Sequence, residues 1–287
     1  MRTDAFDMSL PGRRDTAVVF ASPHSGRAYT RAFLRQTGLD DHAIRSSEDA
    51  FVDHLFETAP RHGAPLVVAH VPRACVDLNR GEDELDPALI EGVRKGPLNP
   101  RVASGLGVIP RVVANGQAIY TGKLPRAEAE RRIETCWRPY HAALREKLDE
   151  AHALFGQAIL VDCHSMPHEA MESVTGAGTR RPDVVLGDRF GAAAGAEVVD
   201  RIEAAFTEAG LVVARNTPFA GAFVVRHYGR PTAGCHAVQV EIDRALYMDE
   251  RRILPSDAFA SFKRALDAVI ARIAQIGRPA EQPLAAE

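Results

Sequence analysis

Short apolar runs alternate with longer amphipathic segments along most of this chain. Several of the short runs are rich in β-branched residues and are apolar at consecutive positions rather than at every second position. Runs of this kind are typical of strands in a sheet that helices cover on both faces. The predicted strands are 16–22, 65–71, 158–163, 183–188, 211–216, 222–227 and 236–242.

Helical periodicity occupies the intervals between these runs. Pro139 lies inside a long pattern and should kink it or divide it into two helices, because proline cannot donate the internal hydrogen bond. Another pattern ends at Gly210, and the last one begins with Ser256 and Asp257 as a cap. The predicted helices are 47–59, 126–155, 195–210 and 255–277.

The remaining segments are less regular. Residues 1–12 are polar and predict a surface arm, whereas 81–125 is rich in Gly, Pro and charge and predicts a long loop insertion. Long loops inside a compact domain usually serve binding or closure. Alternating strands and helices predict an α/β fold, and we expect residues 1–287 to form a single catalytic domain around a mixed, mostly parallel twisted sheet.

Composition narrows the class of protein. The chain has 287 residues, of which 46% are hydrophobic and 25% charged, as in ordinary globular proteins. A net charge of −3 argues against binding to nucleic acid or to a membrane surface. The four cysteines show no CxxC spacing, the N-terminus has no apolar leader, and no run is long enough to span a bilayer. We therefore expect a reduced, cytoplasmic protein.

Two predicted strands lead into similar polar turns. "SPHSG" (22–26) carries His24, and "DCHSMP" (162–167) carries His164. A third polar group, Glu48 with Asp49, lies in "SSED" (46–49), where Ser46 is the expected cap of a helix. Ligand sites in open α/β sheets lie beyond the carboxyl ends of strands, and two imidazoles with one carboxylate match the ligand set of a hydrolytic zinc site.

Each of these residues also has a structural explanation. A histidine at a strand end is commonly a hydrogen-bonded structural residue, and acidic residues in a first helical turn suit the helix dipole. The repetition of the strand–His–Ser pattern favours a shared site. Asp162, two positions before His164, is a candidate to orient an imidazole.

Two further segments carry polar side chains suited to a substrate. Asn79 and Arg80 follow a predicted strand and form a pair that can clamp a carboxylate, although a surface ion pair of Arg80 with Glu82 or Asp83 fits equally well. In "HAVQVEI" (236–242), alternation places Gln239 and Glu241 on one strand face. Partial burial would raise the pKa of Glu241 and suit a general base, whereas the alternative is a buried ion pair with Arg244 or another arginine.

The sequence gives less support to a nucleophilic cysteine or serine and to a nucleotide-binding site. Cys163 and His164 are adjacent in a strand and point to opposite faces, so Cys163 is expected to be a core residue. Ser25 and Ser165 lack the GxSxG context of an α/β-hydrolase, and neither a Walker loop nor a GxGxxG turn is present.

The order and density of these motifs resemble one known family. "PHSG", "SSEDAFVDHLF", "VDLNR", "DCHSMP", "PDVVLGD", "NTPFAGAF…RHYG" and "HAVQVEIDRALYMDE" are similar to segments of the N-formylglutamate amidohydrolase family, over about residues 16 to 270. The resemblance implies a fold like that of zinc carboxypeptidases, within the phosphorylase/hydrolase-like class. It also implies hydrolysis of N-formyl-L-glutamate to formate and L-glutamate, the closing step of one histidine-degradation route.

The resemblance implies roles for the matching residues. His24 and His164 would bind Zn²⁺ or another divalent metal, with Asp49 as the carboxylate ligand, because the family keeps the aspartate of this pair more strictly, and Glu48 as the alternative. Carboxypeptidases have their carboxylate ligand three residues after the first histidine, where Arg27 stands in this chain. Glu241 would be the general base toward a zinc-activated water. The substrate carboxylate would be held by Asn79 and Arg80, and a second carboxylate or the oxyanion by Arg73, Asn216 and Arg226.

Departures from the family pattern keep the substrate open. "GAF" (221–223) and "GAAAG" (191–195) differ from the segments usual in the family, so another N-acyl amino acid is an alternative small-molecule substrate. A carboxypeptidase-like peptidase and an amidase for a different acyl group are further alternatives. A non-catalytic protein that binds small carboxylates is the alternative from another class. The expected assembly is a monomer or a small homo-oligomer.

Overall fold

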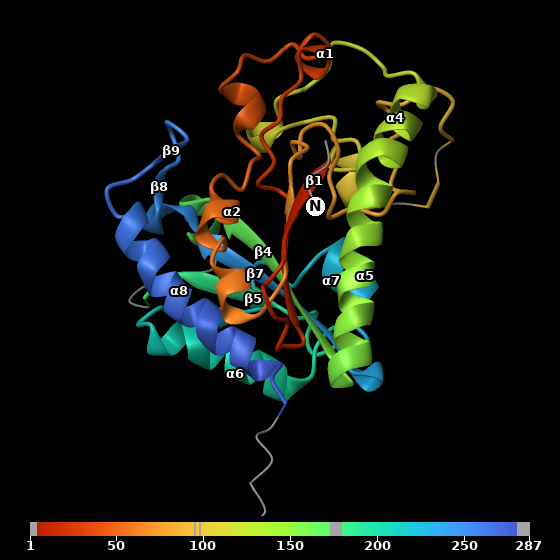
Figure 1. Cartoon of the computed structure of the whole chain (residues 1–287). Coiled ribbons are helices and arrows are strands. Elements are labelled where there is room, and N and C mark those ends of the chain that lie inside the picture. Colours follow the sequence, from red (N-terminus) through yellow and green to blue (C-terminus); the bar gives the residue numbers. More distant parts are fainter. Residues whose placement is uncertain (1–4, 95, 98, 173–179, 280–287) are drawn as a thin grey trace, which may run out of the picture.

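The centre of the molecule is a seven-stranded sheet (Figure 1). The computed structural model describes residues 5–94, 96–97, 99–172 and 180–279. The sheet order is β1-β3-β2-β4-β7-β5-β6, and its strands are β1 Phe6–Ser9, β2 Val18–Ser22, β3 Leu66–Ala69, β4 Ala158–Met166, β5 Val184–Gly187, β6 Val213–Arg215 and β7 Cys235–Asp243. β8 Met248–Asp249 and β9 Leu254–Pro255 form a separate hairpin.

Strand directions make the sheet mixed and mostly parallel. β3, β2, β4 and β7 run parallel to one another, and β6 runs parallel to β5. β1 is antiparallel to β3, and β5 is antiparallel to β7. The expected mixed, mostly parallel sheet is therefore confirmed.

Helices cover both faces of this sheet, as the consecutive apolar positions of the strands require. Val19 and Ala21 of β2 pack into one core with α4 Arg126–Arg132, α5 Arg138–Phe155 and α7 Phe223–Tyr228. Val18 and Phe20 point to the other core, which contains α2 Val52–Leu55, α6 Ala196–Glu208 and α8 Phe259–Ile276. Figure 1 shows these two helical layers on opposite sides of the strands.

The long helical pattern is interrupted before Pro139, as predicted. A π-helical turn, Ile133–Trp137, connects α4 to α5, and Pro139 lies in the first turn of α5. The wider turn accommodates the missing N–H of proline without ending the helical path. Helix α6 likewise ends as expected, with Gly210 in the left-handed region at φ +83°.

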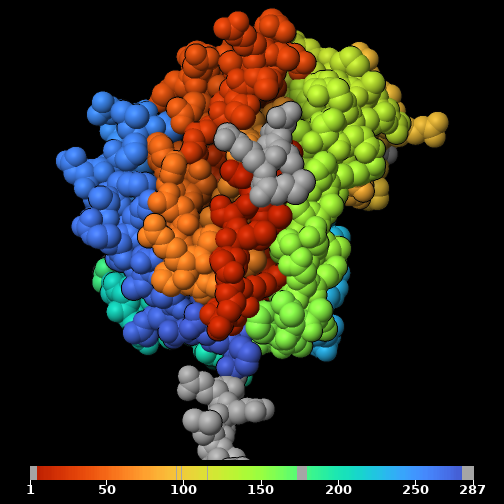
Figure 2. Space-filling view, in the orientation of Figure 1, coloured from red at the N-terminus to blue at the C-terminus, as the bar shows by residue number. Residues whose placement is uncertain are grey.

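Several predicted elements were wrong. Segment 222–227 is a helix, α7, and not a strand, because an apolar run this short carries too little periodicity to separate the two. Residues 6–9 are not a surface arm but edge strand β1, whose Phe6 and Met8 are buried. In Figure 2 this N-terminal segment lies between the region around residues 50–60 and α5.

The prediction for 47–59 also needs correction. Ser46 follows the short 3-10 helix Ala43–Arg45 and does not cap a longer helix; its hydroxyl donates to the carbonyl oxygen of Ala43. Glu48 and Asp49 therefore lie in an irregular link before α2 and not in a helical first turn. Helix α8 begins at Phe259, later than the predicted Ser256/Asp257 cap.

The described residues of segment 81–125 contain little regular structure. The segment holds the short helix α3 Pro100–Ala103 and isolated bridges such as the one from Val112 to Ala118. The other short helical turns are α1 Arg31–Leu34, η1 Ala43–Arg45, η2 Ala59–His62, η3 Ala114–Gly116, η5 His168–Met171, η6 Pro231–Ala233 and η7 Arg244–Leu246. None of the helices in the described part of the chain has the length and apolarity that crossing a bilayer requires.

Candidate active site

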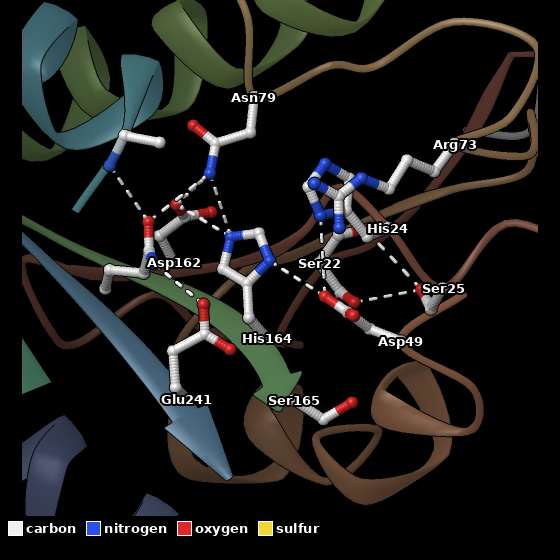
Figure 3. A network of polar contacts seen from close by, with 12 residues as sticks. Ser22, His24, Ser25, Asp49, Arg73, Asn79, Asp162, His164, Ser165 and Glu241 are labelled. Carbon is white, nitrogen blue, oxygen red and sulfur yellow. Dashed lines mark hydrogen bonds and ion pairs between the residues drawn. The ribbon is translucent and has the colours of Figure 1, made fainter. Parts of the chain in front are cut away.

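The two histidines singled out in the sequence lie side by side. His24 follows the end of β2, and His164 lies near the end of the neighbouring parallel strand β4, so both reach the same edge of the sheet. Their ring centroids are 4.7 Å apart, and both side chains are buried. Figure 3 shows the two rings facing a common carboxylate, that of Asp49.

A glycine fixes the turn that carries His24. A Cβ on Gly26 would come within 2.1 Å of the carbonyl oxygen of Val71, so only glycine allows this close approach of the two backbones. Within the same turn, the Ser22 and Ser25 hydroxyls are 2.9 Å apart and hydrogen-bonded. The imidazole is therefore attached to a rigid backbone.

Asp49 completes the group. Its backbone N–H donates to the His24 carbonyl at 3.1 Å, and its Oδ2 lies 2.9 Å from His164 Nδ1 and 3.4 Å from His24 Nδ1. Glu48 turns elsewhere and pairs with Arg45 at 3.0 Å. The potential ligand atoms of His24, Asp49 and His164 all lie within 4.8 Å of one another. Of the two neighbouring carboxylates, Asp49 is thus the one that meets the histidines.

Two more carboxylates lie next to the Nε2 atoms of the imidazole rings, on the side away from Asp49. Asp77 Oδ1 lies 2.7 Å from His24 Nε2, and Asp162 Oδ2 lies 3.0 Å from His164 Nε2. Each ring therefore directs Nδ1 toward Asp49, and among the described residues His24 Nδ1 is buried without a hydrogen-bond partner. Carboxylates behind the coordinating imidazoles are common at metal sites, so this arrangement fits a divalent metal.

The charges around the histidines favour a cation. Burial alone would raise the pKa of Asp49, but the hydrogen bond with His164 and the attraction from both His164 and His24 hold it well below its usual range. Burial disfavours protonation of His164, yet Asp162 and Asp49 raise its pKa well above the ordinary value. The group therefore stabilises positive charge at its centre.

Glu241 lies on the adjacent strand. In the β4–β7 ladder it is in register with His164, and it shares a face with Gln239, whose Nε2 donates to Glu241 Oε1 at 2.8 Å. Burial raises the pKa of Glu241 to about 7. The alternative ion pair with Arg244 is not formed, because Arg244 Nη2 binds Asp49 Oδ1 at 3.0 Å.

These groups open into a cavity of about 530 Å³. One part of its wall comes from segment 81–125, through residues such as Arg101, Leu106 and Val112. Ala220, Gly221 and Ala222 line another part. The guanidinium-bearing residues of the lining are Arg73, Arg80, Arg101 and Arg244.

Both residues of the predicted carboxylate clamp, Asn79 and Arg80, line the cavity, but the side chain of Asn79 is hydrogen-bonded within the protein. Arg80 lines the cavity, where its Nε donates to the Leu106 carbonyl at 2.8 Å and its Nη1 to the Asn79 carbonyl at 2.7 Å. Asn79 is engaged within the protein: its amide nitrogen lies 3.2 Å from His164 Nε2, and its oxygen accepts from Val224 N–H at 2.8 Å. Arg73 also lines the cavity and pairs with Asp77 at 3.1 Å.

Two predicted substrate contacts are not brought to the cavity. Asn216 donates to Asp188 Oδ1 at 2.6 Å, and Arg226 projects from α7 with 59% of its side chain exposed. Neither residue is among those that line the cavity. For Arg226 the cause is the misassigned segment 222–227, since a helix directs alternate residues differently from a strand.

Other contributors were not predicted as site residues. Asp77 precedes Asn79 by two residues and had a weak local signal. Arg244 was named only as an alternative ion-pair partner of Glu241, and Arg101 had no signal that distinguished it from a surface arginine. Cys163 behaves as expected: it is fully buried in the opposite core, and burial raises its pKa well above the ordinary value.

Comparisons with known proteins agree with this geometry. The family model for N-formylglutamate amidohydrolase matches residues 16–248. The N-formylglutamate deformylase of Pseudomonas aeruginosa is 33% identical over 238 residues, covering 82% of this chain and 83% of that protein. The enzyme of the same name from Pseudomonas putida is 30% identical over 236 residues, covering 81% and 82%.

Two solved structures are also similar to this chain, one in sequence and fold and the other in fold alone. The crystal structure of N-formylglutamate amidohydrolase from Ralstonia eutropha superposes with a TM-score of 0.89 and 37% identity, covering 96% of this chain and 99% of that one. A protein of Agrobacterium tumefaciens shares the fold with a TM-score of 0.63 at 17% identity, covering 95% and 96%.

Proposed function

The chain belongs to the N-formylglutamate amidohydrolase family, and from this premise we propose that it hydrolyses N-formyl-L-glutamate, or a closely related N-acyl amino acid, to the free acid and amino acid. The observation that carries the proposal is the buried His24–Asp49–His164 group beside Glu241, inside a cavity lined by arginines. Imidazole and carboxylate donors suit hydrolytic chemistry, and the guanidinium groups suit an anionic substrate.

We propose that His24 Nδ1, His164 Nδ1 and an oxygen of Asp49 hold a divalent metal, with zinc as the first choice. The unsatisfied His24 Nδ1 and the carboxylates behind both rings support this assignment. When bound, such a metal polarises a carbonyl oxygen and makes water more acidic. Three protein ligands are typical of catalytic sites, which keep a position open, and not of structural zinc sites.

Glu241 is the proposed general base. It accepts a proton from the water that attacks the formyl carbon and delivers that proton to the departing amine nitrogen. A carboxyl with a pKa of about 7 suits both steps, because it is neither too weak a base nor too weak an acid near neutral pH. Gln239 fixes the orientation of its carboxylate through the hydrogen bond from Nε2.

The arginines are proposed to bind the anionic parts of the substrate. Arg80, which is held by two backbone carbonyls and lines the cavity, would bind the α-carboxylate. Because Arg226 lies outside the cavity, Arg73 becomes the candidate donor to the oxyanion.

We propose that the chain acts as one catalytic domain in which segment 81–125 contributes to the substrate site. The cytoplasm remains its proposed location, in line with four free cysteines.

The test is release of formate from N-formyl-L-glutamate by the purified protein. Activity should disappear after treatment with a chelator and return when Zn²⁺, or another divalent metal, is added back. Absence of formate from every N-formyl amino acid tried, with metals supplied, would refute the proposal. Cleavage of peptides or of other N-acyl amino acids in preference to the formyl compound would instead favour the peptidase or amidase alternatives.

A further inference from the structure

We propose that Arg101 forms the subsite for the side-chain carboxylate of a dicarboxylate substrate. Arg101 lies on α3, within segment 81–125, and lines the cavity, and its guanidinium forms no ion pair with any residue that the structure describes. The inference rests on the proposed function and explains how the same site would prefer glutamate over amino acids with uncharged side chains.

Among the described residues, the ion pairs of the cavity leave two guanidinium groups without a carboxylate in contact with them. Arg73 pairs with Asp77 at 3.1 Å, and Arg244 pairs with Asp49 at 3.0 Å. Arg80 donates only to backbone carbonyl oxygens, and within the described part of the chain the Arg101 guanidinium makes no hydrogen bond or ion pair. Two cationic groups are therefore available to a ligand that carries two carboxylates.

These two cations also disfavour each other. Burial lowers the pKa of Arg80, and repulsion from Arg73 and Arg101 lowers it further, although Asp77 and Glu84 act in the opposite direction. Like charges that face one cavity are stabilised by an anion placed between them. A monocarboxylate neutralises one of the two, whereas a dicarboxylate neutralises both.

The backbone links the positions of the two arginines. Asn99 caps α3 by accepting from Arg101 N–H at 3.0 Å, and its own amide donates to Glu84 at 3.1 Å. Leu106 N–H then donates to the Arg101 carbonyl, and the Leu106 carbonyl accepts from Arg80 Nε, both at 2.8 Å. Leu106 thus connects the side chain of Arg80 to the backbone of Arg101.

The same connections assign each arginine to one carboxylate. Arg80 is buried and bonds to the carbonyl of Asn79, whose side chain lies 3.2 Å from His164, so Arg80 belongs to the part of the cavity next to the histidines. The α-carboxylate is the one close to the scissile amide and fits there. Arg101 is exposed on the loop wall and suits the distal carboxylate.

The experiment compares two substrates of equal chain length, N-formyl-L-glutamate and N-formyl-L-norvaline, which lacks the distal carboxylate. Wild type should favour the first. In Arg101→Met the ratio of the two kcat/KM values should fall by about 10- to 100-fold, mainly through a higher KM for the glutamate compound, as expected for loss of a charge-assisted hydrogen bond. Arg101→Lys, which keeps the charge, should recover part of the ratio.

The matched control is Arg94→Met, which removes the same charge from an exposed arginine of the same segment outside the cavity and should leave the ratio unchanged. An unchanged ratio in Arg101→Met, or an equal loss for both substrates, would overturn the assignment. So would a lysine variant that recovers nothing. Circular dichroism and metal content establish that each variant is folded. A wild-type protein that hydrolyses neither substrate would refute the proposed function itself, which is a different outcome.

Discussion

Replacement of Asp49 by asparagine tests the metal site most directly. Asparagine keeps the shape of the side chain but removes the charge that faces His24 Nδ1 and His164 Nδ1. Loss of a partner behind a coordinating imidazole weakens metal binding by about 10- to 100-fold. Because Asp49 is proposed to touch the metal itself, we expect Asp49→Asn to weaken binding by more than about 100-fold.

The variant should remain folded, so the measurement is feasible. Its main structural costs are the loss of the ion pair with Arg244, whose side chain is 10% exposed, and a weaker hydrogen bond with His164 Nδ1. Removal of one partner of a buried ion pair costs about 3–5 kcal/mol, which does not exceed the total stability of a typical protein, about 5–15 kcal/mol. Thermal unfolding of the metal-free variant would check this.

Glu48 provides the matched control. Glu48→Gln neutralises the neighbouring carboxylate, which pairs with Arg45 and not with the histidines. Competition with a chromophoric chelator gives the metal dissociation constant of both variants and of wild type. We expect weak binding only in Asp49→Asn. Equal affinity of Asp49→Asn and wild type, or a larger loss in Glu48→Gln, would refute the assignment of the carboxylate ligand.

Four further predictions concern Glu241, Asp162 and Arg226. Glu241→Gln should keep its metal but lower kcat by about 10²- to 10⁴-fold, the usual contribution of a general base. Since the base must be ionised, wild-type kcat/KM should fall as the pH decreases through the pKa of Glu241. Burial raises this pKa to about 7 in the metal-free protein and a bound cation lowers it, so the fall should be centred below pH 7, and the variant should lack this dependence. Asp162→Asn should weaken metal binding by about 10- to 100-fold, with activity restored by excess metal; no change in affinity would remove Asp162 from this role. Arg226→Ala should leave kcat/KM close to wild type, and a large loss would return Arg226 to the oxyanion role.

The main features of the fold were predictable from local pattern. Consecutive apolar residues in 16–22 and 158–163 identified strands buried on both faces, and they correspond to β2 and β4 at the centre of the sheet. The pattern was weakest in short segments. The six residues of 222–227 were compatible with the apolar period of either a helix or a strand, and packing against the sheet selected the helix.

The site was predictable where a side chain follows directly from its strand. His24 and His164 occupy the ends of parallel neighbours, so their meeting required only that the two strands be adjacent. Gln239 and Glu241 share a face because strand geometry alternates. These placements depend on local backbone periodicity, which a sequence displays.

The sequence by itself thus determined the class of fold, the two histidines and the carboxylate on β7. Only the tertiary structure decided that Asp49 and not Glu48 meets the histidines, that Arg244 pairs with Asp49, and that Arg226 lies outside the cavity. Those outcomes depend on irregular links and on contacts between segments up to 195 residues apart. Local propensity does not specify such contacts, because the free energy that selects them comes from burial and charge pairing in the assembled molecule.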